Sequence, residues 1–239
     1  MSPACKPRWS GLKRSQVVLP CPSKGWDFRA MWLQQFPSPD IDCVQRYWDQ
    51  IKDRLLGWKA SYRWPEQASH HESLEKRRVL ENRVESERLA RGLLTKATFD
   101  AIMVWGYGYP LPISAERIES TTQQSFSLLN CSRLSDAASV LMDMKGVGIS
   151  RASKVLSFAD PNSVAIYDSR AADGLFDLTC HGERCLPVPP GRSVKGDSLP
   201  KEDWPTAFHR YVYVVRHFRE LAGASAIECW WASRNSCSW

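Results

Sequence analysis

Apolar positions along this chain recur with the period of an α-helix over most of its length. After Asp40 they occur at Val44, Tyr47, Trp48, Ile51 and Leu55. That spacing places them on one side of a helix and predicts a single buried stripe. The same period predicts further helices over residues 95–105, 114–129, 135–144, 149–159 and 204–222, and a last one near 224–231.

The remaining segments are polar or irregular. Residues 65–92, rich in Glu, Arg and Ser, predict a long helix that faces water. Residues 1–39 predict an irregular N-terminal arm with one short helix near Phe28–Phe36. Residues 180–203 are rich in Pro and Gly and predict a long loop, which in a compact domain is either functional or disordered. No stretch alternates as a strand does, so we expect an all-α fold, with one helical domain over residues 40–239.

Composition narrows the class of protein only modestly. With 43% hydrophobic and 24% charged residues, the chain suits a globular fold. Its net charge of +6 favours a polyanionic partner such as nucleic acid, and its eleven tryptophans suit base stacking as well as core packing. No apolar run fits a signal peptide or a membrane helix, so we expect no membrane partner. The expected location is the cytoplasm, or the nucleus in a eukaryote, with reduced cysteines.

The segment KGVGISRASKVLSFADPNSVAIYDSR holds the most specific pattern in the chain. Gly146 and Gly148 stand between two helix-periodic segments and predict a tight turn. The second helix then starts with unpaired N–H groups, which suit a phosphate oxygen. Ser150, Arg151 and Lys154 on that helix can add hydroxyl and cationic contacts to a nucleic-acid backbone.

Asp168 lies eighteen positions after Ser150 and directly before the segment SRAADGLF. It occupies the expected N-cap of a following helix, where a carboxylate is favoured in its charged form. One interpretation is a structural cap alone. The other is a catalytic carboxylate that stabilises a positively charged sugar as an N-glycosidic bond breaks, and that orients or deprotonates the attacking water. The spacing from the glycine turn favours the catalytic interpretation.

Over residues 134–176 these motifs resemble the helix–hairpin–helix DNA glycosylase superfamily. The matching letters are GVG at Gly146–Gly148 and YDSR at Tyr167–Arg170. The resemblance implies a two-lobed helical bundle with the helix–hairpin–helix at residues 135–159 and the catalytic segment at 160–176. It implies that Asp168 is the catalytic residue and that DNA with a flipped-out base is the partner of a monomeric enzyme.

Departures from the family pattern refine this expectation. In bifunctional members a lysine stands two residues after the second hairpin glycine and forms a Schiff base, whereas here Ser150 stands there and cannot. We therefore expect a monofunctional enzyme in which water attacks, the base is released and the abasic strand stays uncut. Lys154, one turn further along, is expected to contact phosphate or to lie at the surface. Arg170 is expected to contact phosphate or to pair with Asp168.

Cofactors are not expected. The four-cysteine spacing of members with an iron–sulfur cluster is not matched by Cys180, Cys185, Cys229 and Cys237. Half of a zinc site could be formed by Cys180, His181 and Cys185. No second ligand pair with zinc-like spacing follows, however. We therefore expect neither a cluster nor a metal.

A glycosylase must extrude its target base and hold it between flat side chains. The turn WGYGYPLP supplies Trp105, Tyr107 and Tyr109, and Tyr167 directly precedes Asp168. These four aromatic residues are the predicted walls of a base pocket, with core or turn packing as the alternative for each. The sequence leaves open which base is removed. The rival function is a non-catalytic DNA-binding module that uses the glycine turn only for affinity, and a third alternative is a structural helical protein.

Overall fold

The computed structural model describes residues 35–61, 70–191 and 194–223 of the chain, which are mostly helical. The helices are α2 (Ile41–Ser61), α3 (His70–Arg91), α4 (Lys96–Tyr107), α5 (Ala115–Asn130), α6 (Leu134–Met142), α7 (Ile149–Ala159), α8 (Ser169–Asp173) and α9 (Trp204–Ala222). One short 3-10 helix, η1 (Lys201–Asp203), precedes α9. The helix expected near residues 224–231 lies outside the described residues, as does most of the one expected near 28–36.

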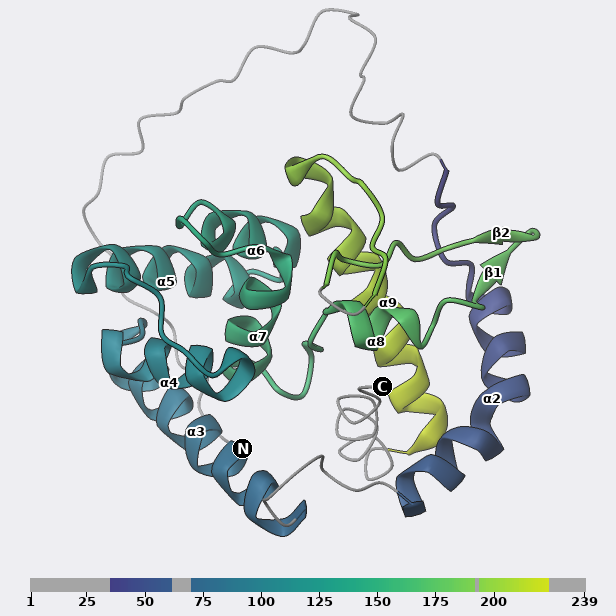
Figure 1. The fold of residues 1–239 in the computed structure, drawn as a ribbon, viewed down its shortest axis with the longest axis horizontal. Coiled ribbons are helices and arrows are strands. Elements are labelled where there is room, and N and C mark those ends of the chain that lie inside the picture. The colour runs from purple at the N-terminus through teal and green to yellow at the C-terminus, as the bar shows by residue number, and fades with distance from the viewer. Residues whose placement is uncertain (1–34, 62–69, 192–193, 224–239) are drawn as a thin grey trace, which may run out of the picture.

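The helix α7 lies at the centre of this arrangement. It contacts α3, α4, α6 and α9, while α2 and the small sheet lie on the far side of α9 (Figure 1). Residues from Ala152 to Ala159 are all buried, and small side chains such as Ser153 and Ser157 let the neighbouring helices approach closely. The core therefore surrounds α7 on several sides rather than meeting one apolar stripe.

Two helices begin where the capping residues indicate. Thr95 caps α4, accepting a hydrogen bond from the Thr98 backbone N–H at 3.3 Å, and Ser114 caps α5 in the same way from Arg117. The helix predicted over residues 135–144 is α6, which begins one residue earlier, at Leu134, and ends at Met142. Ser132, with φ of 59°, reverses the chain early enough to place Ser135 inside the first turn.

The long loop after α8 contains a feature that the sequence did not predict. Strands β1 (Thr179–Cys180) and β2 (Glu183–Arg184) form an antiparallel hairpin, with Thr179 opposite Arg184. Further along, Asp197 accepts a hydrogen bond from the Val188 backbone N–H at 2.6 Å and pairs with Arg184 at 2.5 Å. The described part of this loop thus has defined contacts with its own residues.

None of the described helices is long and apolar enough to cross a membrane.

Candidate functional site

The glycine turn joins α6 to α7 at the surface. Gly146 has a φ of +84°, in the left-handed region that favours glycine, and the Val147 N–H donates to the Met144 carbonyl at 3.0 Å. Gly148 has an extended backbone and is the N-cap of α7, where no side chain caps the first turn. Both glycines are exposed. The first N–H groups of α7 are therefore open to an anion from outside.

Arg151 connects this turn to the aromatic residues at the end of α4 and just after it. Its Nη1 donates to the Gly146 carbonyl at 2.7 Å, and its Nη2 donates to the Tyr109 hydroxyl at 2.7 Å. Its guanidinium carbon also lies 4.4 Å from the centre of the Tyr107 ring. Residues predicted separately as backbone contacts and as pocket walls are therefore neighbours. Of the two tyrosines, Tyr109 is exposed over 47% of its surface.

Asp168 occupies the N-cap of α8, as the sequence predicts. Its Oδ1 accepts a hydrogen bond from the Ala171 backbone N–H at 2.9 Å, and its Oδ2 lies 3.1 Å from the Lys154 Nζ. The side chain keeps 16% of its surface exposed, so it is largely but not completely enclosed. Arg170, half-buried on the first turn of α8, lies close enough to interact with it.

The surroundings of Asp168 favour its charged form. Burial alone would raise its pKa, but the Lys154 ammonium, the Ala171 N–H and Arg170 outweigh burial and hold the pKa below its usual value. For Lys154, burial alone would lower the pKa, but Asp168 and the Tyr107 hydroxyl raise it above its usual value. Both groups are therefore charged at neutral pH.

The position of Lys154 corrects the expectation that it contacts phosphate or lies at the surface. Its side chain is only 5% exposed and points inward from α7 to the carboxylate of Asp168. Tyr107 also contacts it, with the hydroxyl 3.5 Å and the ring centre 4.8 Å from Nζ. Ser150, by contrast, is half-buried at the start of α7, where its carbonyl accepts a hydrogen bond from the Ser153 hydroxyl.

Tyr167 belongs to the core rather than to the wall of an open pocket. Its ring is fully buried, with its centre 4.7 Å from that of Tyr211, and its hydroxyl donates to the Pro187 carbonyl. Its backbone N–H donates to the Ser153 hydroxyl at 2.9 Å. Tyr167 therefore anchors the segment that carries Asp168 to α7 without offering a flat face to a base.

Trp105 is also packed against neighbouring helices. Its ring meets Phe158 of α7 edge-on at 5.0 Å, and the Arg77 guanidinium lies 5.8 Å from the ring centre. Of the four predicted aromatic walls, the structure brings only Tyr107 and Tyr109 to the open side of the site, beside Arg151.

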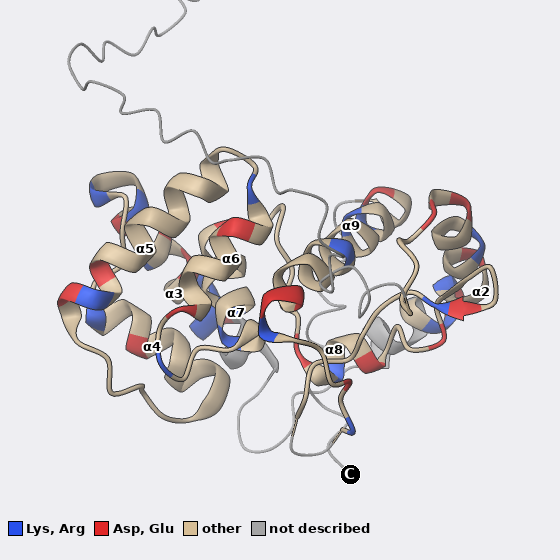
Figure 2. Cartoon of the chain, turned by 90° about the horizontal axis from the view of Figure 1, so that it is seen from above, with Lys and Arg blue, Asp and Glu red and all other residues tan. Residues whose placement is uncertain are grey.

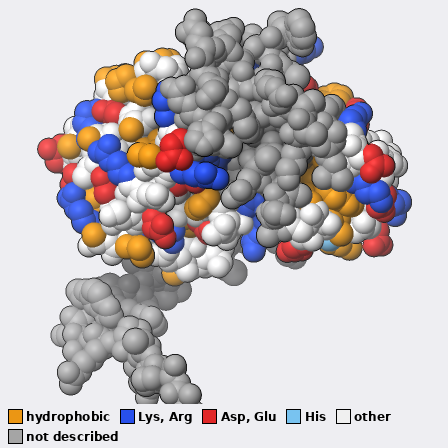
Figure 3. Space-filling model, turned by 90° about the horizontal axis from the view of Figure 1, so that it is seen from below, with side chains coloured by type: hydrophobic (Ala, Val, Ile, Leu, Met, Phe, Trp, Pro, Cys, Tyr) orange, Lys and Arg blue, Asp and Glu red, His pale blue; other side chains and the backbone are white. Residues whose placement is uncertain are grey.

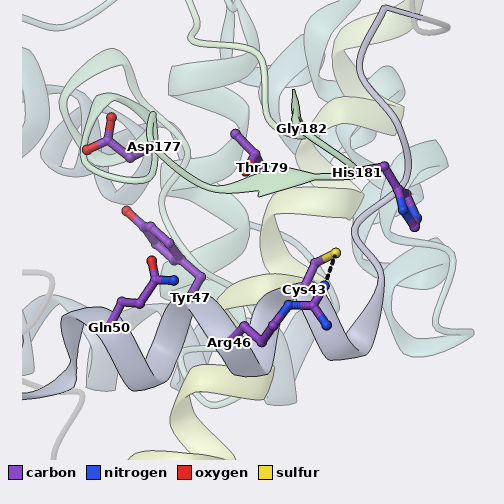
Figure 4. Close-up of a pocket in the computed structure, with 8 residues that line it drawn as sticks. All are labelled: Cys43, Arg46, Tyr47, Gln50, Asp177, Thr179, His181 and Gly182. Carbon is purple, nitrogen blue, oxygen red and sulfur yellow. Dashed lines mark hydrogen bonds between the residues drawn. The ribbon is translucent and has the colours of Figure 1, made fainter.

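A second polar site, which no pattern in the sequence predicts, lies at the other end of the molecule. A pocket of about 250 Å³ lies between α2 and the β1–β2 hairpin (Figure 4). Its lining consists of Cys43, Arg46, Tyr47, Gln50, Asp177, Thr179, His181 and Gly182. None of these residues contributes to the group around Asp168. They come from segments more than 120 positions apart, so no local motif marks them.

Three buried cysteines, Cys43, Cys180 and Cys185, gather near this pocket. Arg46 donates to the Cys43 sulfur at 3.0 Å, and the Asp40 backbone N–H donates to the Cys180 sulfur at 3.5 Å. Within the described parts of the chain, no group of three or more His, Cys, Asp or Glu side chains is arranged to hold a metal ion. The hydrogen bond from Asp40 to Cys180 links the residue before α2 to the hairpin.

Charged side chains of both signs are interspersed over the described helices (Figure 2). On the face shown in Figure 3, basic side chains likewise lie among acidic and hydrophobic ones. On the part of that face where described residues are visible, the positive charge thus does not gather into one patch, and a contact with a polyanion would depend on local groups such as those at the glycine turn.

Comparison of the chain with protein-family models, curated proteins and solved structures finds no match.

Proposed function

We propose that this chain is a monofunctional DNA glycosylase of the helix–hairpin–helix type, in which Asp168 assists hydrolysis of the bond between a modified or damaged base and deoxyribose. The observation that carries the proposal is Asp168 itself. Two donors hold its carboxylate charged at the start of a helix, while part of its surface remains open to a substrate.

A charged carboxylate in an enclosed site is suited to this reaction. As the base leaves, positive charge develops on the sugar, and a fixed anion stabilises that charge more strongly than water would. Asp168 also orients the water that attacks the sugar. The raised pKa of Lys154, which Asp168 and Tyr107 produce against the effect of burial, keeps its amine protonated. Because a protonated amine has no lone pair for attack on the sugar, the product is an abasic site on an uncut strand.

The glycine turn would hold the DNA backbone. The open N–H groups at the start of α7 suit a phosphate oxygen, and Arg151 and Tyr109 border them. Gly146, Gly148 and Ser150 then serve as backbone contacts, with Arg170 on the Asp168 side. The exposed Tyr109 and the adjacent Tyr107 are the aromatic groups available for contact with a base.

A panel of duplex and single-stranded DNAs with oxidised, alkylated, deaminated or enzymatically modified bases tests the proposal. Wild type should release a free base, detected by mass spectrometry, and leave sites that break only after alkali. Asp168→Asn should bind the same DNA within about threefold and release base at least ~100-fold more slowly, the scale of losing one electrostatic contribution to catalysis.

DNA binding by both proteins, without base release from any member of the panel, would instead favour the non-catalytic DNA-binding module. The open start of α7 and the neighbouring Arg151 are the features that would support that alternative.

A further inference from the structure

Lys154 is a charged residue on the most deeply buried helix of the described structure. Every residue of α7 from Ala152 to Ala159 is buried, and the lysine is 4% exposed. An ammonium group in such a place needs a partner of opposite charge. Asp168 supplies it at 3.1 Å, and the Tyr107 hydroxyl and ring complete its surroundings.

The lysine reaches the carboxylate through a space beside Gly106 in α4. A Cβ atom at position 106 would lie 2.7 Å from Cδ and 2.9 Å from Cε of Lys154, closer than real contacts allow. Glycine is otherwise unfavourable inside a helix, because it gains flexibility on unfolding and has no side chain to pack. Any other residue at this position would displace the lysine from its present path.

The two oxygens of Asp168 have separate donors. Oδ1 accepts from the Ala171 N–H at the start of α8, while Oδ2 accepts from Lys154 on α7. The plane of the carboxylate is thereby fixed between two elements, which neither donor alone would achieve. Among the described residues, the charged groups that act on it most strongly are Lys154 from α7 and Arg170 from α8, and Tyr107 at the end of α4 contacts the lysine.

We propose that Lys154 is a positioning residue for Asp168, which keeps the carboxylate ionised and correctly oriented. Gly106 leaves room for the lysine side chain, and Tyr107 contacts its amine. A part in catalysis rests on the proposed function of Asp168. The effect of Lys154 on the ionisation and orientation of the carboxylate, however, is a property of the protein without DNA. The lysine forms no bond to the substrate in this role. It acts through the carboxylate.

The direct test measures the titration of Asp168 by carbon-13 NMR of its carboxyl group in the full chain. In Lys154→Met the pKa should rise by about one to three units, since burial then acts without the neighbouring ammonium. Lys96→Met is the matched control, because Lys96 forms a surface ion pair with Asp100 at 2.7 Å on α4. It should leave the titration of Asp168 unchanged.

Gly106→Ala provides a second variant that keeps every charge. Alanine favours the helix, so α4 should remain folded, but the added methyl group displaces the lysine stem. The pKa of Asp168 should rise in this variant too, by less than in Lys154→Met. An unchanged titration in Gly106→Ala, or in a folded Lys154→Met, overturns the proposal.

Kinetics provide the second readout. In single-turnover base release, the acidic limb of the pH profile should move upward in both variants by the same amount as the NMR pKa. An adduct between wild type and DNA that is trapped by borohydride and lost in Lys154→Met would also overturn the proposal, because the lysine would then be a nucleophile. Absence of base release by wild type would contradict the proposed function alone, since the NMR titration would still decide the positioning role.

Discussion

Lys154 and Asp168 are each too buried for either charge to be stable alone, and they come from different elements. Such a pair contributes little net stability compared with apolar residues of the same volume, because both ions lose their hydration. Removing only one partner is different, since it leaves an uncompensated charge in the interior. The pair therefore makes single substitutions costly while the double substitution is tolerated.

We predict that Lys154→Met lowers the free energy of unfolding by about 3–5 kcal/mol, measured by urea denaturation at pH 7. The double variant Lys154→Met with Asp168→Asn should recover most of that loss. Lys96→Met, which removes an exposed partner, should cost less than about 1 kcal/mol. Equal stability of wild type and Lys154→Met would contradict the buried pair.

The lowered pKa of Asp168 also predicts how stability depends on pH. Burial opposes the shift, but Lys154 and the Ala171 N–H outweigh it, so folding favours the ionised form. A group with a depressed folded pKa adds stability above its unfolded pKa, near ~3.9 for Asp, and that stability is lost as the pH falls through the folded value. The stability difference between wild type and Asp168→Asn should thus be constant from pH 7 to 5 and shrink on acidification below about pH 4. Urea titrations at each pH measure it, and a difference independent of pH would refute this linkage.

At the scale of elements, the start of α8 is held by the loop that follows it. Gly191 packs so closely on α8 that a Cβ there would lie 2.2 Å from the Ser169 Oγ and 2.8 Å from its Cβ. Ser169 directly follows Asp168. The loop thus restricts how far the carboxylate-bearing turn can move.

Gly191→Ala should therefore destabilise the fold by about 1–3 kcal/mol, as overpacking does, and slow base release if Asp168 is catalytic. Adding Ser169→Ala removes the nearest clashing atom and should restore part of the stability. Thermal unfolding of the two variants provides the measurement. Wild-type stability in Gly191→Ala would show that the loop moves aside without cost.

Most of the longer helices were readable from the sequence because they have an apolar face at helical spacing, as in α2 and α9, whereas α3 was readable from its polar, Glu- and Arg-rich composition. The hairpin β1–β2 was not, because two-residue strands contain too few positions to alternate. For Lys154 the sequence predicts a phosphate contact or a surface position, because a lone lysine usually faces water. One signal in the sequence indicated that α7 is buried: small and apolar residues occur around its whole circumference. A second signal was Gly106 inside α4, which leaves space for the Lys154 side chain.

At the scale of the whole molecule, arginines from distant helices fix the segment between α7 and Asp168. Arg88 of α3 donates to the Ala159 carbonyl, and Arg219 of α9 donates to the Asn162 carbonyl at 2.6 Å. Such contacts between distant parts of the chain are invisible in local patterns. They also mean that the geometry at Asp168 depends on helices that contribute no residue to the site.

Arg151 carries a consequence for how the molecule would respond to salt. Its two terminal nitrogens already bond the Gly146 carbonyl and the Tyr109 hydroxyl, and its charge lies against the Tyr107 ring. These acceptors are neutral, so the guanidinium keeps its charge beside the glycine turn. A phosphate bound at the amides of α7 would then be neutralised mainly by this one cation, which contributes about 0.9 to the logarithmic salt slope. Fluorescence anisotropy between low and high ionic strength should give a shallow slope, and Arg151→Gln should lower that slope by about 0.9. Such a protein would stay bound to DNA at salt concentrations that dissociate proteins bound through lysine-rich surfaces.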